Sequence, residues 1–338
     1  MRENNNLHSC KAVVSRNVRN FKMGGTSQRN APAFPLFVLP SRFFSRPLEE
    51  RKERFFFERK VMKKVLFKGI SSLIILMLLL SSNVYADFID ETGYLSYSFE
   101  SGSDSCVQVR GRNSSVTRID IPSTVVYEYQ EYDKEDEEYK TRRRTCRVTS
   151  VAKEGFKNYK SLVSVSIPSS VKRLGQTAFF QNSSLSDILI FGSNLTNIEY
   201  NCFADCVALK TFNLPHGLEY IGGSVFSGCI ELENIEIPSS VKSIGDGAFA
   251  DCVKLTDVKL PSKITSIENS SFLRCTALRQ VICLGGINKI GSHAFQECLS
   301  LEEAIIPNGV TIVGDYAFNA CKALTKIETP SSLQQLGD

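Results

Sequence analysis

The chain has 338 residues, of which 42% are hydrophobic and 22% are charged, and its formal net charge is +4 at pH 7. The charge is uneven: residues 1–61 contribute +8 and residues 62–86 contribute +3, which leaves −7 for residues 87–338. Proteins that bind nucleic acid gain affinity by neutralising phosphates, so this acidic remainder argues against a nucleic-acid partner.

Residues 1–61 form a basic N-terminal extension without a sustained hydrophobic period. They hold 13 Lys or Arg against 5 Asp or Glu. One interpretation is a basic arm for nucleic acid or an anionic surface. The other is an upstream start codon that is not used. The sequence that follows favours this second interpretation, because it begins with Met62 and has the features of a targeting segment.

Residues 62–86 have the three parts of a secretory signal peptide. Lys63 and Lys64 form the charged part, Leu73–Leu80 is the apolar part, and Val84 and Ala86 supply small residues at positions −3 and −1 of a cleavage site. The apolar part is short for a membrane span. We therefore predict export and cleavage after Ala86. The mature chain would have no membrane span and would reside at the cell surface, in the extracellular medium or in the periplasm.

Residues 87–161 are predicted to form an N-terminal cap of β-strands. Leu95–Phe99 alternates like a strand, Cys106–Val109 is a second candidate, and Ile119–Pro122 matches the first strand of the repeat described below. An acidic, tyrosine-rich insertion at 126–147 interrupts that repeat. It is either an exposed protein-binding patch or a solvated hairpin over the end of the core, since terminal repeats need a polar covering.

Residues 162–338 repeat with a period of 23, marked by a phenylalanine that already occurs at the end of the cap. Self-similarity at such a period predicts a solenoid of stacked units. A cysteine follows most of these phenylalanines three positions later. The predicted structural core therefore contains two ladders, which are Phe156, Phe179, Phe203, Phe226, Phe249, Phe272, Phe295 and Phe318, and Cys206, Cys229, Cys252, Cys275, Cys298 and Cys321.

One repeat shows which elements to expect. Ile235–Ile237 alternates like a short strand, Pro238 closes it, and Val241–Ile244 is a second extended stretch. Gly245 comes next, and we expect a positive φ there. The following Ala-Phe pair and cysteine suit one helical turn. A single unit buries too little apolar surface to offset its conformational entropy, so it must be stacked on its neighbours.

The run I-P-S-S-V-x-x-I-G-x-x-A-F-x-x-C-x-x-L covers residues 148–338, with a matching segment at 93–125. It resembles the BspA-like leucine-rich repeat of bacterial and protist surface proteins. Phe191 and Leu284 depart from the pattern by replacing the proline, and Glu199 and Glu268 replace the glycine.

This resemblance implies a repeat solenoid: a leucine-rich-repeat-like right-handed coil with one parallel β-sheet, short helical turns and loops. It would hold about eight 23-residue repeats in addition to the N-terminal β cap. The resemblance also implies adhesion, with extracellular-matrix or host surface proteins as partners.

The cysteines are predicted to be mostly reduced and buried. Equivalent residues of neighbouring coils lie about 4.8 Å apart, wider than the roughly 3.5–4.5 Å between the Cβ atoms of a disulfide, so the ladder thiols would pack as small hydrophobes. Cys106 with Cys146 is the one candidate disulfide, and it would tie the cap together. No metal site is predicted, because the ladder lacks close pairs of ligands and no histidine joins it.

Catalysis finds no support in the sequence. His216 and His293 occupy different phases of the repeat and do not converge, and no nucleophile, phosphate-loop or zinc motif is present. We therefore predict neither an enzyme nor a cofactor.

The outward face of the predicted sheet is the candidate partner-binding surface. Strand alternation places on it Asp187, Thr211, Asn213, Asn234, Glu236, Asp257, Lys259, Gln280, Ile282, Glu303 and Ile305. None of them is aromatic, which disfavours sugar stacking and weakly favours an extended protein partner. A merely solvated face explains the pattern equally well.

The sequence thus predicts an exported, non-enzymatic protein that mediates protein–protein interaction or adhesion. One alternative is a structural spacer or a module of a longer surface protein, and another is a polysaccharide-binding accessory protein. The last repeat stops before its Ala-Phe pair, so we expect an incomplete C-terminal repeat. The oligomeric state is left open.

Overall fold

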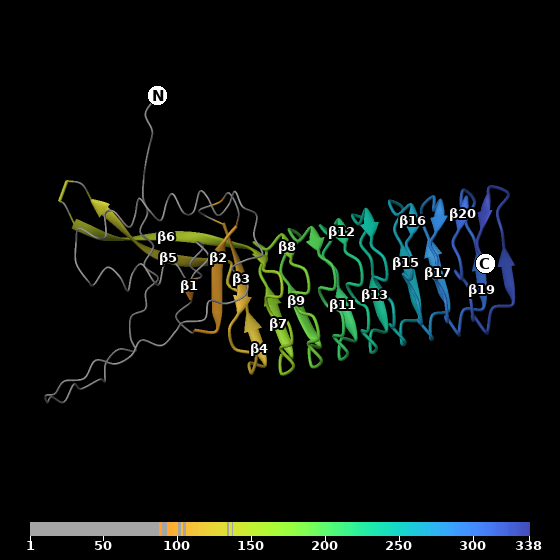
Figure 1. The fold of residues 1–338 in the computed structure, drawn as a ribbon, viewed down its shortest axis with the longest axis horizontal. Coiled ribbons are helices and arrows are strands. Elements are labelled where there is room, and N and C mark those ends of the chain that lie inside the picture. The colour runs from red at the N-terminus through yellow and green to blue at the C-terminus, as the bar shows by residue number, and fades with distance from the viewer. Residues whose placement is uncertain (1–87, 90–92, 101–102, 104–105, 134, 137) are drawn as a thin grey trace, which may run out of the picture. The chain divides into compact units, whose positions relative to one another are not determined.

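The computed structural model describes residues 88–89, 93–100, 103, 106–133, 135–136 and 138–338. The predicted extension at 1–61 and signal peptide at 62–86 lie outside these residues. Within the described residues every regular element is a β-strand. The strands stack as successive coils of a solenoid (Figure 1). The predicted repeat solenoid of about eight coils, spaced by about 23 residues, is confirmed.

Most coils contribute one longer strand and one shorter strand, which line up in two rows. The long-strand row is β4 (Arg118–Asp120), β7 (Ser164–Ile167), β9 (Asp187–Ile190), β11 (Thr211–Asn213), β13 (Asn234–Glu236), β15 (Asp257–Leu260), β17 (Gln280–Cys283), β19 (Glu303–Ile305) and β21 (Lys326–Glu328). The short-strand row is β8 (Arg173–Leu174), β10 (Asn197–Ile198), β12 (Tyr220–Ile221), β14 (Ser243–Ile244), β16 (Ser266–Ile267), β18 (Lys289–Ile290), β20 (Ile312–Val313) and β22 (Gln335–Leu336).

Pairing within both rows is parallel and joins equivalent residues of adjacent coils. Phe212 aligns with Ile235 in the long-strand row, and Ile221 aligns with Ile244 in the short-strand row. The structure therefore has two rows of parallel strands where we expected one parallel sheet, because the second extended stretch also pairs from coil to coil. The pairing is interrupted between β9 and β11 and between β17 and β19 in the long-strand row, and between β14 and β16 in the short-strand row. At the first of these breaks the spacing of the phenylalanines rises to 24 residues.

The segment around each stacked phenylalanine is an irregular turn and not the predicted helical turn. Ser224 and Gly228 flank Phe226 at two residues on either side, and their φ angles are 52° and 74°. Left-handed residues at both places prevent a right-handed helix. The N–H groups of Ser224, Phe226 and Gly228 instead donate to carbonyl oxygens of the next coil at 2.8–2.9 Å. This segment thus forms a third ladder of hydrogen bonds between coils.

The glycine that follows six of the eight short strands lies at a close backbone approach, and Glu199 and Glu268 hold the same place after β10 and β16. Gly175, Gly222, Gly245, Gly291, Gly314 and Gly337 do not have the positive φ that we predicted. A Cβ atom on Gly245 would lie 2.5 Å from the backbone nitrogen of Gly223, and one on Gly291 would lie 2.5 Å from that of Asn269. The absence of a side chain therefore allows successive coils to approach each other closely at this point.

The core contains the two predicted ladders side by side. Successive phenylalanine rings, from Phe156 to Phe318, lie 5.3–5.9 Å apart between centroids, with interplanar angles of 4–12°. Each ladder thiol donates a hydrogen bond to the carbonyl oxygen of the phenylalanine one coil earlier, at 3.0–3.3 Å. Burial raises the pKa of these thiols, to about 12 for Cys206, so they remain protonated donors at neutral pH.

The N-terminal cap continues the short-strand row. β1 (Phe88–Ile89), β2 (Leu95–Phe99) and β3 (Cys106–Gly111) pair in antiparallel order, and β3 then pairs in parallel with β6 (Glu138–Val151), which leads to β8. Tyr97 on β2 is fully buried, and its ring stacks on Phe88 at 5.4 Å. The cap therefore covers the first coil with an apolar layer.

The insertion within the first coil is a β-hairpin. β5 (Thr124–Asp133) pairs in antiparallel order with β6, and the two strands are labelled in Figure 1. At the base, the buried ring of Tyr127 lies 5.0 Å from Phe88 and 5.2 Å from Phe99. Farther out, Tyr132 and Tyr139 are exposed. Only the base of the hairpin therefore packs against the cap.

The predicted disulfide between Cys106 and Cys146 is not formed. The register of β3 and β6 aligns Cys106 with Arg147, the residue after Cys146. Because side chains alternate along a strand, the two cysteines point to opposite faces of the sheet. Cys106 is a free thiol.

Candidate protein-binding surface

The long-strand row presents a continuous outer face. In β11, β13 and β15 the central residues Phe212, Ile235 and Val258 are buried in the core, while the residues on either side of them are exposed. This alternation follows from the two-residue period of a strand. All the residues that we predicted for the partner-binding face are exposed.

The register between coils arranges these residues in two lines that cross the strands, which together form the outer face. Asn234 aligns with Asp257, and Lys259 aligns with Ile282. The first line contains Thr211, Asn234, Asp257 and Gln280, and the second contains Asn213, Glu236, Lys259 and Ile282. The exposed residues of β9 are Asp187 and Leu189, and those of β19 are Glu303 and Ile305.

At each end of the long-strand row, a basic and an acidic side chain form an ion pair with each other. Arg118 on β4 forms an ion pair with Asp120 at 3.0 Å, and this hydrogen-bonded contact lowers the pKa of the Asp120 carboxyl. Lys326 on β21 forms an ion pair with Glu328 at 2.6 Å, which raises the pKa of the Lys326 ammonium group. The net charge of each of these two pairs is therefore close to zero.

The middle of the outer face has an excess of negative charge. Asp187, Glu236, Asp257 and Glu303 are carboxylates, and Lys259 is the single cation among the predicted face residues. Among the ion pairs of the described residues, none involves these five side chains. Asp187 and Glu303 still act electrostatically on Arg118 and Lys326, and they raise the pKa of these two side chains. With Lys259 included, the five face residues keep a net negative charge, which favours a partner with positive charge.

Sequence reasoning did not place two residues that belong to this surface. Phe191 and Leu284 directly follow β9 and β17 and are 55% and 54% exposed. They continue the alternation of Leu189 and Ile282, which are also exposed. The expectation that no aromatic residue lies at this face is therefore corrected. The signal was present in the sequence, because these are the two repeats in which the proline is replaced by a large apolar residue.

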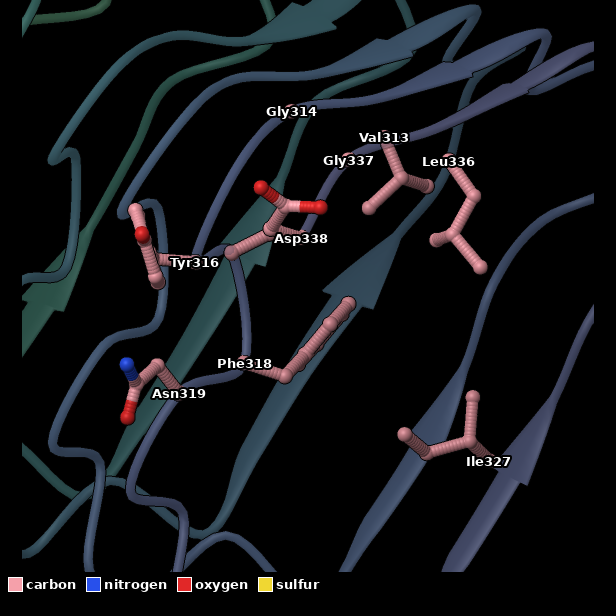
Figure 2. Close-up of a pocket in the computed structure, with 10 residues that line it drawn as sticks. Val313, Gly314, Tyr316, Phe318, Asn319, Ile327, Leu336, Gly337 and Asp338 are labelled. Carbon is pink, nitrogen blue, oxygen red and sulfur yellow. The ribbon is translucent and has the colours of Figure 1, made fainter.

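The C-terminal end of the solenoid has a pocket lined by core residues of the last coils (Figure 2). Val313, Phe318, Ile327 and Leu336 contribute apolar side chains to it, and Ile327 and Leu336 are exposed. Ile327 occupies the position at which Ala304 is buried one coil earlier. The lining of this pocket is mainly apolar and includes no convergent set of reactive groups.

The described residues contain no group of three or more His, Cys, Asp or Glu that could hold a metal ion. His293 contacts Gln296 through Nδ1 at 2.6 Å and stacks on Tyr316 at 5.3 Å. His216 is exposed in a different coil. None of the described segments forms a helix that could cross a membrane.

Comparisons with known proteins agree with this architecture. The family model described as the BspA type leucine rich repeat region matches residues 143–256 and 242–338, with six copies. No curated protein matches the chain. The leucine-rich repeat protein TpLRR of T. pallidum is 29% identical, with 63% of this chain and 90% of that one covered and a TM-score of 0.52.

The pneumococcal vaccine antigen PcpA shares the fold, with 20% identity, coverage of 75% of this chain and 72% of that one, and a TM-score of 0.54. The family match extends over more than half of the chain and coincides with the stacked coils. The chain therefore belongs to the BspA-type leucine-rich repeat family.

Proposed function

We propose that this protein is an exported, non-enzymatic adhesion module that binds an extracellular or host surface protein through its outer face. The observation that carries the proposal is the acidic middle of that face, where four carboxylates on separate strands have no ion-pair partner within the described residues. A flat ladder of exposed side chains suits an extended protein surface. Membership of a family of interaction modules supports the same assignment.

Binding of the full chain to immobilised extracellular-matrix proteins, mucins and polysaccharides tests this proposal. A variant with Glu236→Lys and Glu303→Lys reverses two charges on the outer face. The matched control carries Asp246→Lys and Asp315→Lys, which reverse two exposed charges that follow short strands. We expect saturable binding to a protein that the first variant loses and the control retains.

A second candidate function is that of a structural spacer. It is favoured by the small polar residues in the middle of the face, such as Thr211, Asn213 and Asn234, which offer a partner little apolar area. The same assay separates the two functions. Equal behaviour of the wild type and both variants against every surface would support the spacer.

Export is the second part of the proposal. It depends on the signal-peptide pattern at 62–86, and the acidic charge of the chain beyond it is compatible with an extracellular protein. Mass spectrometry of the protein released from cells should find an N-terminus at Asp87. Peptides from residues 1–61 on the exported protein would contradict this processing.

A further inference from the structure

Two apolar clusters protrude from the outer face at separate coils. The first, here called the β9 anchor, consists of Leu189 and Phe191, which are 45% and 55% exposed. The second, the β17 anchor, consists of Ile282 and Leu284, which are 41% and 54% exposed. Ile305 on the next strand, 65% exposed, extends the β17 anchor. Paired large apolar side chains at two places on one face are characteristic of interaction sites.

Both anchors arise from the same departure from the repeat. The seven other strands of the long-strand row are followed by proline, and proline has no N–H to donate. Phe191 donates its N–H to the carbonyl oxygen of Ile167 at 2.9 Å, and Leu284 donates to that of Leu260 at 3.0 Å. The replacements therefore add one hydrogen bond to the ladder and direct an apolar side chain outward.

The space between the anchors is polar and has a small net negative charge. β11, β13 and β15 lie between β9 and β17 and present Glu236 and Asp257 together with Lys259. Four strand steps of about 4.8 Å separate the anchors by about 19 Å. An extended chain covers this distance in about six residues, at about 3.3 Å per residue. Because six is even, two side chains so spaced point to the same side of the partner.

We propose that the outer face recognises an extended, basic polypeptide segment with two apolar side chains about six residues apart. The apolar side chains contact the β9 and β17 anchors, and the basic residues between them lie over Glu236 and Asp257. This inference rests on the proposed function, because it specifies the partner of the same surface. Charge complementarity favours such a segment over a second copy of this chain, whose own outer face is acidic.

Selection of random 16-residue peptides displayed on phage against the full chain tests the inference. The anchor variant carries Leu189→Thr, Phe191→Gln, Ile282→Thr and Leu284→Gln, which keep every backbone N–H. A control variant carries Ile230→Thr and Leu299→Gln, which remove exposed apolar side chains elsewhere. Unchanged thermal midpoints show that both variants fold.

We expect selected peptides to be basic, with two apolar residues about six positions apart. Their affinity should fall at least tenfold for the anchor variant and in 0.5 M salt, and should be unchanged for the control variant. Selected peptides that are acidic, that bind the anchor variant equally well, or that do not exceed background would overturn the inference.

The surface-binding assay distinguishes this failure from failure of the proposed function. If the protein partner found there is lost with Glu236→Lys and Glu303→Lys but is retained by the anchor variant, the outer face is an adhesion surface and the two-anchor inference is wrong. If that partner is lost with the anchor variant and retained by the control, the inference is supported.

Discussion

The thiol of Cys252 donates a hydrogen bond to the carbonyl oxygen of Phe226, 26 residues earlier, at 3.2 Å. The same oxygen accepts the backbone N–H of Cys229 at 3.0 Å. Cys252→Ala would remove one donor and leave a small void, which should cost about 2 kcal/mol of stability. Cys252→Ser keeps a donor and should cost less.

Urea denaturation, monitored by circular dichroism, measures the relative stabilities of the wild type, Cys252→Ser and Cys252→Ala. Cys283→Ala is a suitable control, because Cys283 is only half-buried and lies outside the ladder. Equal midpoints for Cys252→Ala and the wild type would contradict a stabilising role for the ladder.

Stability should fall at alkaline pH because of the buried thiols. Burial raises the pKa of Cys206 to about 12 in the folded chain, against about 8.5 for an exposed cysteine. Above the unfolded pKa the unfolded chain loses a proton that the folded chain keeps, so each such thiol lowers stability by about 1.4 kcal/mol per pH unit. This loss continues until the pH reaches the folded pKa.

Denaturation midpoints measured between pH 7 and pH 12 test this dependence. Cys206→Ser should have a shallower decline than the wild type above pH 9, since serine does not ionise there. Tyrosine ionisation is common to both proteins and cancels. Identical slopes would show that Cys206 makes no such contribution.

Gly245 should tolerate a side chain poorly. Gly245→Ala would place a Cβ atom 2.5 Å from the nitrogen of Gly223, and we expect a loss of about 1–3 kcal/mol. Gly286 offers a matched control, because a Cβ atom there would have no neighbour within 4 Å. Gly286→Ala should be neutral or stabilise by up to about 1 kcal/mol. Thermal melting that ranked the two substitutions in the opposite order would contradict the close approach.

The outer part of the hairpin should be dispensable for folding. Tyr129 aligns with Arg142 across β5 and β6, so residues 130–141 can be replaced by Asn-Gly, which forms a two-residue hairpin turn. The contacts of Tyr127 with Phe88 and Phe99 remain. We expect a melting temperature close to that of the full chain. A large drop in melting temperature would show that the tip supports the solenoid.

The stacked coils could be predicted from the sequence because single apolar residues, Phe226 and its equivalents, recur at a nearly constant spacing and are buried. It did not predict the left-handed residues. Ser224 and Asp251 have φ of 52° and 62°, although neither residue type requires that conformation. Hydrogen bonds to the next coil determine it, and local propensity contains no information about them.

The same limit explains the other errors. Gly245 suggested a positive φ, which is a local property, whereas its role is a contact with Gly223 of the preceding coil. The pairing of Cys106 with Cys146 was inferred from elimination, but a one-residue difference in register separates their side chains. The candidate face was predicted from alternation alone, and Phe191 was missed because the strand was expected to end before it.

The coils are joined by main-chain hydrogen bonds and by apolar contact, and this determines how the solenoid would respond to mechanical load. Each coil holds 23 residues but advances the stack by only about 4.8 Å. A force that separates the two ends would peel coils one after another, and each would release about 75 Å of chain. A solenoid pulled at its two ends would thus lengthen in nearly equal steps. Single-molecule stretching should resolve these steps, and a single rupture of the whole stack would exclude such behaviour.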